Sequence, residues 1–116
     1  MDADGIAALL SGYRFHWNNE RELQDHIEKV LTNSSIAFKR EYRLCSRDRV
    51  DFLCGAVAIE VKMASSQAQV LAQLFRYAES CEVESLILVT NRARQLEMPD
   101  TLLNKPLRVV FVSGYL

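Results

Sequence analysis

The sequence predicts a single α/β domain over residues 1–116, in which helices flank a mixed central sheet. Residues 49–62 are typical of two short strands joined by a tight turn, and two segments begin with helix-capping patterns. Residues 84–90 form a continuous apolar run of strand length, which is typical of a strand covered on both faces. The expected element order is helix, three strands, helix, strand, connector and strand.

Composition places the chain among globular proteins, because 49% of its residues are hydrophobic and 25% are charged. Its 116 residues suffice for one core but not for two. No apolar run approaches the ~18 residues that a bilayer span needs. The first residues lack the positively charged region of a secretory signal, so no such signal is expected. We therefore expect no membrane contact and a cytoplasmic location, which would be the host cytoplasm for a phage protein.

Cysteine usage fits the same compartment. Cys45, Cys54 and Cys81 are odd in number and lack C-x-x-C spacing. We interpret them as reduced, mostly buried thiols rather than as disulfide or zinc ligands.

Net charge is -1, which excludes a whole-surface electrostatic grip on nucleic acid. The basic residues are nevertheless concentrated in one short segment that leads into Asp51, namely Lys39, Arg40, Arg43, Arg47 and Arg49. Two interpretations stay open for this segment: a solvated strand edge with its loop, or contacts to a nucleic-acid backbone.

Two helices are expected in the first third of the chain. Residues 1–17 hold apolar side chains at helical spacing, and a second helix is expected over about residues 20–31. Asn19 and Glu22 resemble a capping box, and the apolar stripe that follows is Leu23, Ile27, Val30 and Leu31. Periodicity places Glu20 toward the core side and Glu22 on the polar face. Alternatively, Glu20 merely favours the positive end of the helix dipole.

Strands and a third helix follow. Residues 36–44 alternate as a strand, and the hairpin turns at Cys54-Gly55-Ala56. A second capping box predicts a helix from Ser66 to about residue 81, with a wide buried face of Val70, Leu71, Leu74, Phe75 and Ala78. Gln73 and Tyr77 lie four residues apart at the margin of that face. Residues 84–90 and 107–112 are predicted strands, and residues 91–105 a mixed connector.

Charged side chains interrupt the apolar hairpin. Val57, Ile59 and Val61 share one face of the second strand, so Glu60 and Lys62 share the other. Asp51 interrupts the partner strand, where the hairpin can bring it beside Glu60. Such groups cost desolvation free energy unless they pair or bind a metal ion.

The two carboxylates suggest a metal site. Asp51 and Glu60 supply hard oxygen ligands, and the backbone carbonyl of Val61 together with water molecules would complete the octahedral set that Mg²⁺ prefers. Such an ion would polarise a phosphodiester and lower the pKa of water. Glu20 could add a ligand for a second ion.

Neighbouring groups suggest hydrolysis. Lys62 would hold or activate the attacking water and stabilise developing negative charge. Glu20 could orient that water from the helix side. Gln73 and Tyr77, on the helix after the lysine strand, would contact a phosphate backbone or orient the lysine.

These residues resemble the PD-(D/E)XK nuclease superfamily over roughly residues 18–90. The resemblance rests on Asp51, on Glu60-Val61-Lys62, on a preceding helix Glu and on Gln73-Leu74-Phe75-Arg76-Tyr77. The trailing Q-x-x-x-Y resembles RecB-like members, and Glu20-Arg21-Glu22-Leu23 resembles the start of archaeal Holliday-junction resolvases. Val50 stands where many members have proline.

That resemblance implies a restriction-endonuclease-like αβββαβ core and a metal-dependent nuclease. It implies Asp51 and Glu60 as ligands, Lys62 as catalytic and Glu20 as an auxiliary acid. The expected cofactor is Mg²⁺, with Mn²⁺ as a substitute and no organic cofactor.

We expect hydrolysis of DNA phosphodiester bonds, chosen by DNA structure such as a branch or junction, in recombination, repair or phage DNA processing. Arg40, Arg43 and Arg49 would bind the DNA backbone, which positions a protein without specifying sequence. A homodimer would suit a junction with two equivalent strands. Two alternatives stay open: a nuclease acting on single-stranded or flapped ends, and a catalytically silent nucleic-acid-binding or interaction module on the same fold.

Overall fold

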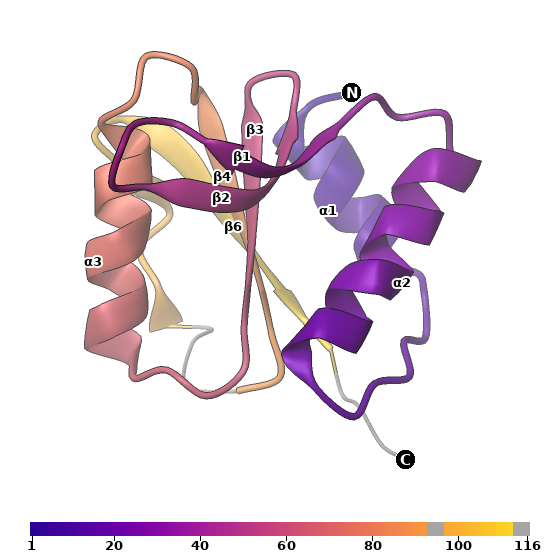
Figure 1. The fold of residues 1–116 in the computed structure, drawn as a ribbon. Helices are drawn as coiled ribbons and strands as arrows, with labels where there is room; N and C mark the ends of the chain where they lie inside the picture. The colour runs from indigo at the N-terminus through magenta and orange to yellow at the C-terminus, as the bar shows by residue number, and fades with distance from the viewer. Residues whose placement is uncertain (93–96, 113–116) are drawn as a thin grey trace.

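Helices cover both faces of a mixed β-sheet in the computed structural model, which describes residues 1–92 and 97–112 (Figure 1). The helices are α1 (Ala3–Ser11), α2 (Glu20–Asn33) and α3 (Gln67–Ala78). The strands are β1 (Lys39–Arg43), β2 (Arg49–Cys54), β3 (Val57–Lys62), β4 (Ser85–Thr90), β5 (Thr101–Leu102) and β6 (Lys105–Phe111). From α2 onward, the predicted order of helix, three strands, helix and strand is confirmed.

The six strands lie in the order β1-β2-β3-β4-β6-β5. Strands β1, β2 and β3 are antiparallel neighbours, whereas β3, β4 and β6 run parallel. Every residue of β4 after Ser85 is buried, which confirms the prediction of a strand covered on both faces. The α3 crossover joins β3 to β4, as a parallel pair requires.

Two hydrophobic clusters fill the spaces on either side of the sheet. One lies under α1 and α2 and includes Phe52, Val57, Ile59 and Val61. The other lies under α3 and includes Val50, Ala58 and Leu74. The predicted alternation of β3 is confirmed, so Glu60 and Lys62 lie on its α3 side.

Local sequence signals fix the element ends. Gly55 has φ +59 in the two-residue turn between Cys54 and Val57, where a glycine avoids the strain that a side chain would meet. Asn19 caps α2 through its side chain, and Ser66 with Gln69 forms a complete capping box on α3.

The buried face of α3 differs from the prediction. Phe75 is 41% exposed, whereas Tyr77 is fully buried with Val70, Leu74 and Ala78. The helix also ends at Ala78 rather than near residue 81. Tyr77 lies one turn beyond Leu74 and two turns beyond Val70, so the helix presents that row to the sheet and turns Phe75 toward solvent.

Other expectations need correction too. The predicted connector contains the short strand β5, which pairs with the start of β6; residues 93–96 of this connector lie outside the described residues. Cys45 and Cys81 are exposed, so only Cys54 is a buried thiol, and the prediction of mostly buried cysteines is wrong. Within the described ranges, no helix has the length and apolar character that a bilayer span requires.

Candidate active site

The backbone ladder between β2 and β3 stops short of Asp51 and Glu60. Pairing runs from the turn to Phe52 and Ile59, and Asp51 would meet Glu60 next in this register. Hydrogen bonds between backbone and side chains connect the strands there: the Asp51 amide donates to Glu60 Oε1 at 3.2 Å, and the Val61 amide donates to Asp51 Oδ2 at 2.8 Å. Each carboxylate thus binds the backbone of the other strand, and the predicted proximity of the two acids is confirmed.

Strand β2 changes face at Asp51. Val50 packs under α3, whereas Phe52, two residues later, packs under α1 and α2. Regular alternation would place both on one face. Opposite Asp51, Glu41 has φ 52 and is missing from the otherwise continuous β1–β2 register. This missing pair coincides with the face change, and the Asp51 carboxylate is directed toward the β3 backbone at Val61.

Lys62 completes the cluster from the same face of β3. Its Nζ lies 3.2 Å from Glu60 Oε2, and the Glu60 side chain is only 4% exposed. Burial raises the pKa of Glu60 to about 8; the charge of Asp51 acts in the same direction and Lys62 opposes it. Burial also raises the pKa of Asp51, against the Val61 hydrogen bond and Lys62. Two buried carboxylates whose pKa values are both raised form a site that a bound cation would stabilise.

The two acids at the start of α2 have different surroundings. Burial raises the pKa of Glu20, which also feels the charges of Lys62 and Asp51. Glu22 instead accepts from the Asn18 amide at 2.8 Å, and its own amide donates to Asn19 Oδ1 at 2.9 Å. Glu20 therefore lies within electrostatic reach of the cluster, while Asn19 caps the helix and the Glu22 side chain binds the Asn18 amide rather than the Asn19 amide that the predicted capping box requires.

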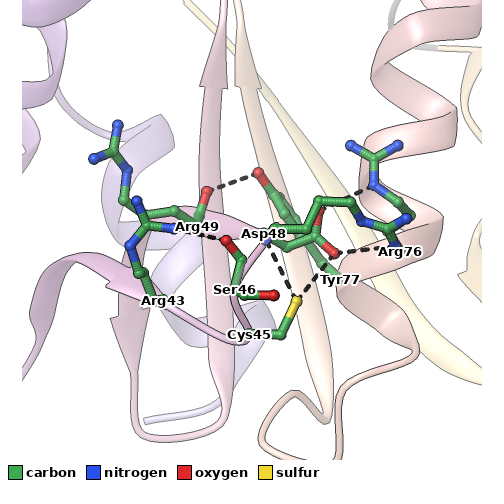
Figure 2. A network of polar contacts seen from close by, with 8 residues as sticks. Arg43, Cys45, Ser46, Asp48, Arg49, Arg76 and Tyr77 are labelled. Atoms are coloured by element: carbon green, nitrogen blue, oxygen red, sulfur yellow. Dashed lines mark hydrogen bonds and ion pairs between the residues drawn. The ribbon is translucent and has the colours of Figure 1, made fainter.

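Tyr77 supports the cluster from the core. Its hydroxyl donates to the Arg49 carbonyl at 2.9 Å (Figure 2). Burial, followed by the charges of Glu60 and Asp51, raises its pKa. With 0% of its surface exposed, Tyr77 lies behind the site rather than at a surface that a substrate could reach. Gln73 is half-buried one turn earlier, and its side chain forms no hydrogen bond within the described residues.

The arginines predicted to bind substrate are not equivalent. Arg40 is 18% exposed and pairs through Nη1 with α2, at 2.8 Å from Asp25 Oδ1 and 3.2 Å from Glu28 Oε1. Its guanidinium thus ties β1 to α2. Arg43 is exposed and donates to the Ser46 carbonyl, and Arg49 is 53% exposed, 3.7 Å from Glu41. Arg43 and Arg49 therefore remain accessible, whereas Arg40 is committed to the fold.

Arg92 is a site neighbour that the sequence did not reveal. Its Nε donates to the Met63 carbonyl at 2.6 Å, one residue beyond Lys62. Lys62 pairs with Thr90 across the parallel strands, so both residues lie where β3 and β4 end. Arg92 is exposed. Sequence spacing carries no sign of this proximity, because the parallel pairing of distant segments creates it.

Asp48 and Arg76 form a second unpredicted contact next to the cluster. Arg76 Nε donates to Asp48 Oδ1 at 3.0 Å, between the β1–β2 turn and α3 (Figure 2). Asp48 is 6% exposed. Burial alone would raise the pKa of Asp48, but the Arg76 hydrogen bond and the charges of Arg47 and Arg76 together hold it below its usual range.

The donor set fits a small hard cation. Among the described residues, no group of three or more His, Cys, Asp or Glu side chains is gathered for metal binding. Asp51 Oδ1 has no hydrogen-bond partner in the described part of the chain, and the Val61 carbonyl faces the same gap as its amide. Two carboxylates, one carbonyl and water suit Mg²⁺, which keeps several waters, and not a soft metal.

Two clefts lie away from these residues. The larger, of about 490 Å³, is lined by the N-terminal residues and the β2–β3 turn around Gly55. The other, of about 400 Å³, lies beside Phe38 and Leu53. Neither is lined by Asp51, Glu60 or Lys62. We place the candidate site at the carboxylate cluster, because the clefts do not combine paired buried acids with a lysine.

No protein-family model, curated protein or solved structure matches this chain. Family membership is accordingly a proposal that rests on the site residues and on the order of the elements.

Proposed function

We propose that this protein is a Mg²⁺-dependent deoxyribonuclease of the PD-(D/E)XK type. One observation carries the proposal: Asp51 and Glu60 meet in a break of the β2–β3 ladder, with Lys62 3.2 Å from Glu60. The sequence of α2, β1, β2, β3, α3 and β4 supports it, because the αβββαβ core has the same order of elements.

Asp51, Glu60 and the Val61 carbonyl would hold the ion. When bound, Mg²⁺ supplies positive charge that neutralises a phosphodiester and stabilises the charge developing on it. The protein's own groups do the rest. Lys62 would donate hydrogen bonds to the attacking water or to a phosphate oxygen, and Glu20, half-buried at the start of α2, would orient water from the helix side.

DNA backbone binding would involve the exposed guanidinium groups near the cluster. Arg92 lies beside Lys62 at the ends of β3 and β4, and Arg43 and Arg49 lie on the β1–β2 hairpin. Arginine side chains bind phosphate through bidentate hydrogen bonds. Such contacts position the protein on the DNA without reading the bases. Selection by DNA shape, at a branch or junction, is therefore the favoured specificity.

A substrate panel tests the proposal. Labelled duplex, single-stranded, flapped and four-way-junction DNA are incubated with Mg²⁺, Mn²⁺ or chelator. We expect metal-dependent cleavage that Asp51→Asn and Lys62→Ala abolish. The matched controls Asp100→Asn and Lys29→Ala change exposed residues of the same types and should cleave like the wild type.

Three results would contradict the proposal. Cleavage that persists in chelator would show that the reaction does not depend on a metal ion. Full activity of Asp51→Asn would show that the active site is wrongly assigned. Tight DNA binding without cleavage of any substrate would favour the silent binding module instead.

A further inference from the structure

We propose that the Asp48–Arg76 pair is a positioning element for the candidate site: by fixing the start of β2 to α3, it holds Asp51 opposite Glu60. The proposal rests on the proposed function for its kinetic consequence. Neither residue touches the carboxylate cluster directly, so both are positioning residues rather than catalytic ones.

The first step is that β3 does not align the start of β2. Their backbone pairing ends at Phe52 and Ile59, so residues 49–51 have no backbone partner in β3. The contacts between Asp51 and β3 run through side-chain oxygens, which adapt to small shifts. Strand β1 pairs with Arg49 and Val50 but not with Asp51, so further contacts must help to position this segment.

The second step is that α3 holds this segment at two successive residues. Arg76 Nε bonds Asp48 Oδ1 at 3.0 Å, and the next helix residue, Tyr77, bonds the Arg49 carbonyl at 2.9 Å. Figure 2 shows both contacts reaching from one turn of α3 to consecutive residues of the chain. In Figure 1, the β1–β2 turn extends to α3 accordingly.

The third step is that hydrogen bonds within the β1–β2 turn connect Asp48 to the rest of that turn. Asp48 Oδ2 accepts from Cys45 Sγ at 3.7 Å, and the Asp48 amide donates to the same sulfur at 3.4 Å. The Leu44 amide donates to the Asp48 carbonyl at 2.9 Å. Arg47 Nη2 lies 3.6 Å from Asp48 Oδ2, but Arg47 is exposed and does not connect to α3. Arg76 is therefore the charged group that joins this turn to the helix.

A kinetic comparison of variants that remove one charge of the pair tests the proposal. Asp48→Asn and Arg76→Gln should each lower kcat on the best DNA substrate by about ten- to a hundredfold, with KM nearly unchanged, because small misplacement of a reacting group costs this much. The double variant should be no worse than either single one, because both break the same contact. Arg76→Lys should recover part of the loss.

The Arg108–Asp4 pair supplies a matched control. Arg108 Nε binds Asp4 Oδ1 at 2.7 Å, between β6 and α1, away from the cluster. Arg108→Gln should leave kcat unchanged. Wild-type kcat in a folded Arg76→Gln variant, or equal losses in Arg76→Gln and Arg108→Gln, would overturn the proposal.

Amide hydrogen exchange tests the same geometry without any nuclease activity. In Arg76→Gln, the amides of Asp51 and Val61 should exchange at least about tenfold faster, while those of Cys54 and Val57 at the turn stay protected. Uniform or absent change would overturn the proposal. An inactive wild type would overturn the proposed function alone, since the exchange pattern still decides whether Arg76 positions Asp51.

Discussion

Asp51 and Glu60 each bind the backbone of the other's strand, through Val61 and Asp51 amides at 2.8 and 3.2 Å. The backbone pairing of β2 with β3 ends at Phe52 and Ile59, and the two carboxylates make the next contacts between the strands. The backbone amides orient both side chains, so the site is pre-organised before any ligand arrives. The cost is a pair of buried acids, and this cost has measurable consequences.

Stability without metal should fall as pH rises. Burial and Asp51 raise the pKa of Glu60 from 4.5 to about 8, so the folded state holds this proton more tightly than the unfolded state. The stabilisation that this Glu60 proton provides is complete below pH 4.5 and is lost as pH rises through about 8. The free energy of unfolding should fall by up to about 1.4 kcal/mol per pH unit in this range. Denaturant unfolding in chelator from pH 5 to 9 measures it.

Glu60→Gln is the control for this pH dependence, because it keeps the shape and removes the proton. The difference in the free energy of unfolding between the wild type and Glu60→Gln should shrink or reverse toward low pH. Mg²⁺ should raise the wild-type Tm more at pH 8 than at pH 6, since the ion binds the deprotonated acids, and should not raise the Tm of Glu60→Gln. Parallel stability curves for the two proteins would contradict the assigned cause.

Removal of the Lys62 ammonium should separate catalysis from folding. Lys62→Met should lower kcat by about 10²–10³-fold, the usual loss for one donor to developing charge. Its free energy of unfolding should fall by less than the about 3–5 kcal/mol typical of a broken buried pair, because Glu60 binds a proton instead. Circular dichroism melts and single-turnover rates measure the two effects. A large loss of stability with an unchanged rate would reverse this assignment.

Glu20 and Glu22 should respond oppositely to the same substitution. Glu20→Gln removes a charge near Lys62 and Asp51, so activity should fall at least about tenfold with little change in Tm. Glu22→Gln weakens the cap on the Asn18 amide, so it should cost about 0.5–1 kcal/mol of stability and leave the rate unchanged. The reverse ranking of activities would mean that the α2 acids are wrongly assigned.

Arg92 should contribute to DNA binding more than an ordinary surface cation does. Arg92→Ala should weaken binding and lower the slope of log K against log salt by about 1, as expected for one lost phosphate contact. Lys29→Ala, an exposed change of equal charge on α2, should leave that slope unaltered. Equal slopes for both variants would show that Arg92 does not touch a phosphate.

Much of the fold was predictable because its signals are local. Asn19 and Ser66 mark the starts of α2 and α3, and Gly55 marks the hairpin turn. The alternation of β3 placed Glu60 and Lys62 together on one face. These features depend on residues within a few positions of one another, where backbone sterics and capping decide the outcome.

Long-range packing decided the remainder. Helical spacing placed Phe75 in the buried face of α3 and Tyr77 at its margin, and only the docking of α3 on the sheet buried Tyr77 and exposed Phe75. The basic segment gave no sign that Arg40 pairs with α2, because those partners are acids twelve or more residues away in sequence.

The grouping of Glu60 and Lys62 on one face of β3 was thus determined by the sequence itself, since alternation fixes which side chains share a strand face. Only the tertiary structure decided how Asp51 reaches the cluster, through the face change beside Val50, and that Arg92 and the Asp48–Arg76 pair lie next to it. The physical reason is that strand pairing and helix docking bring together segments about thirty residues apart, and no local pattern encodes the distance between them.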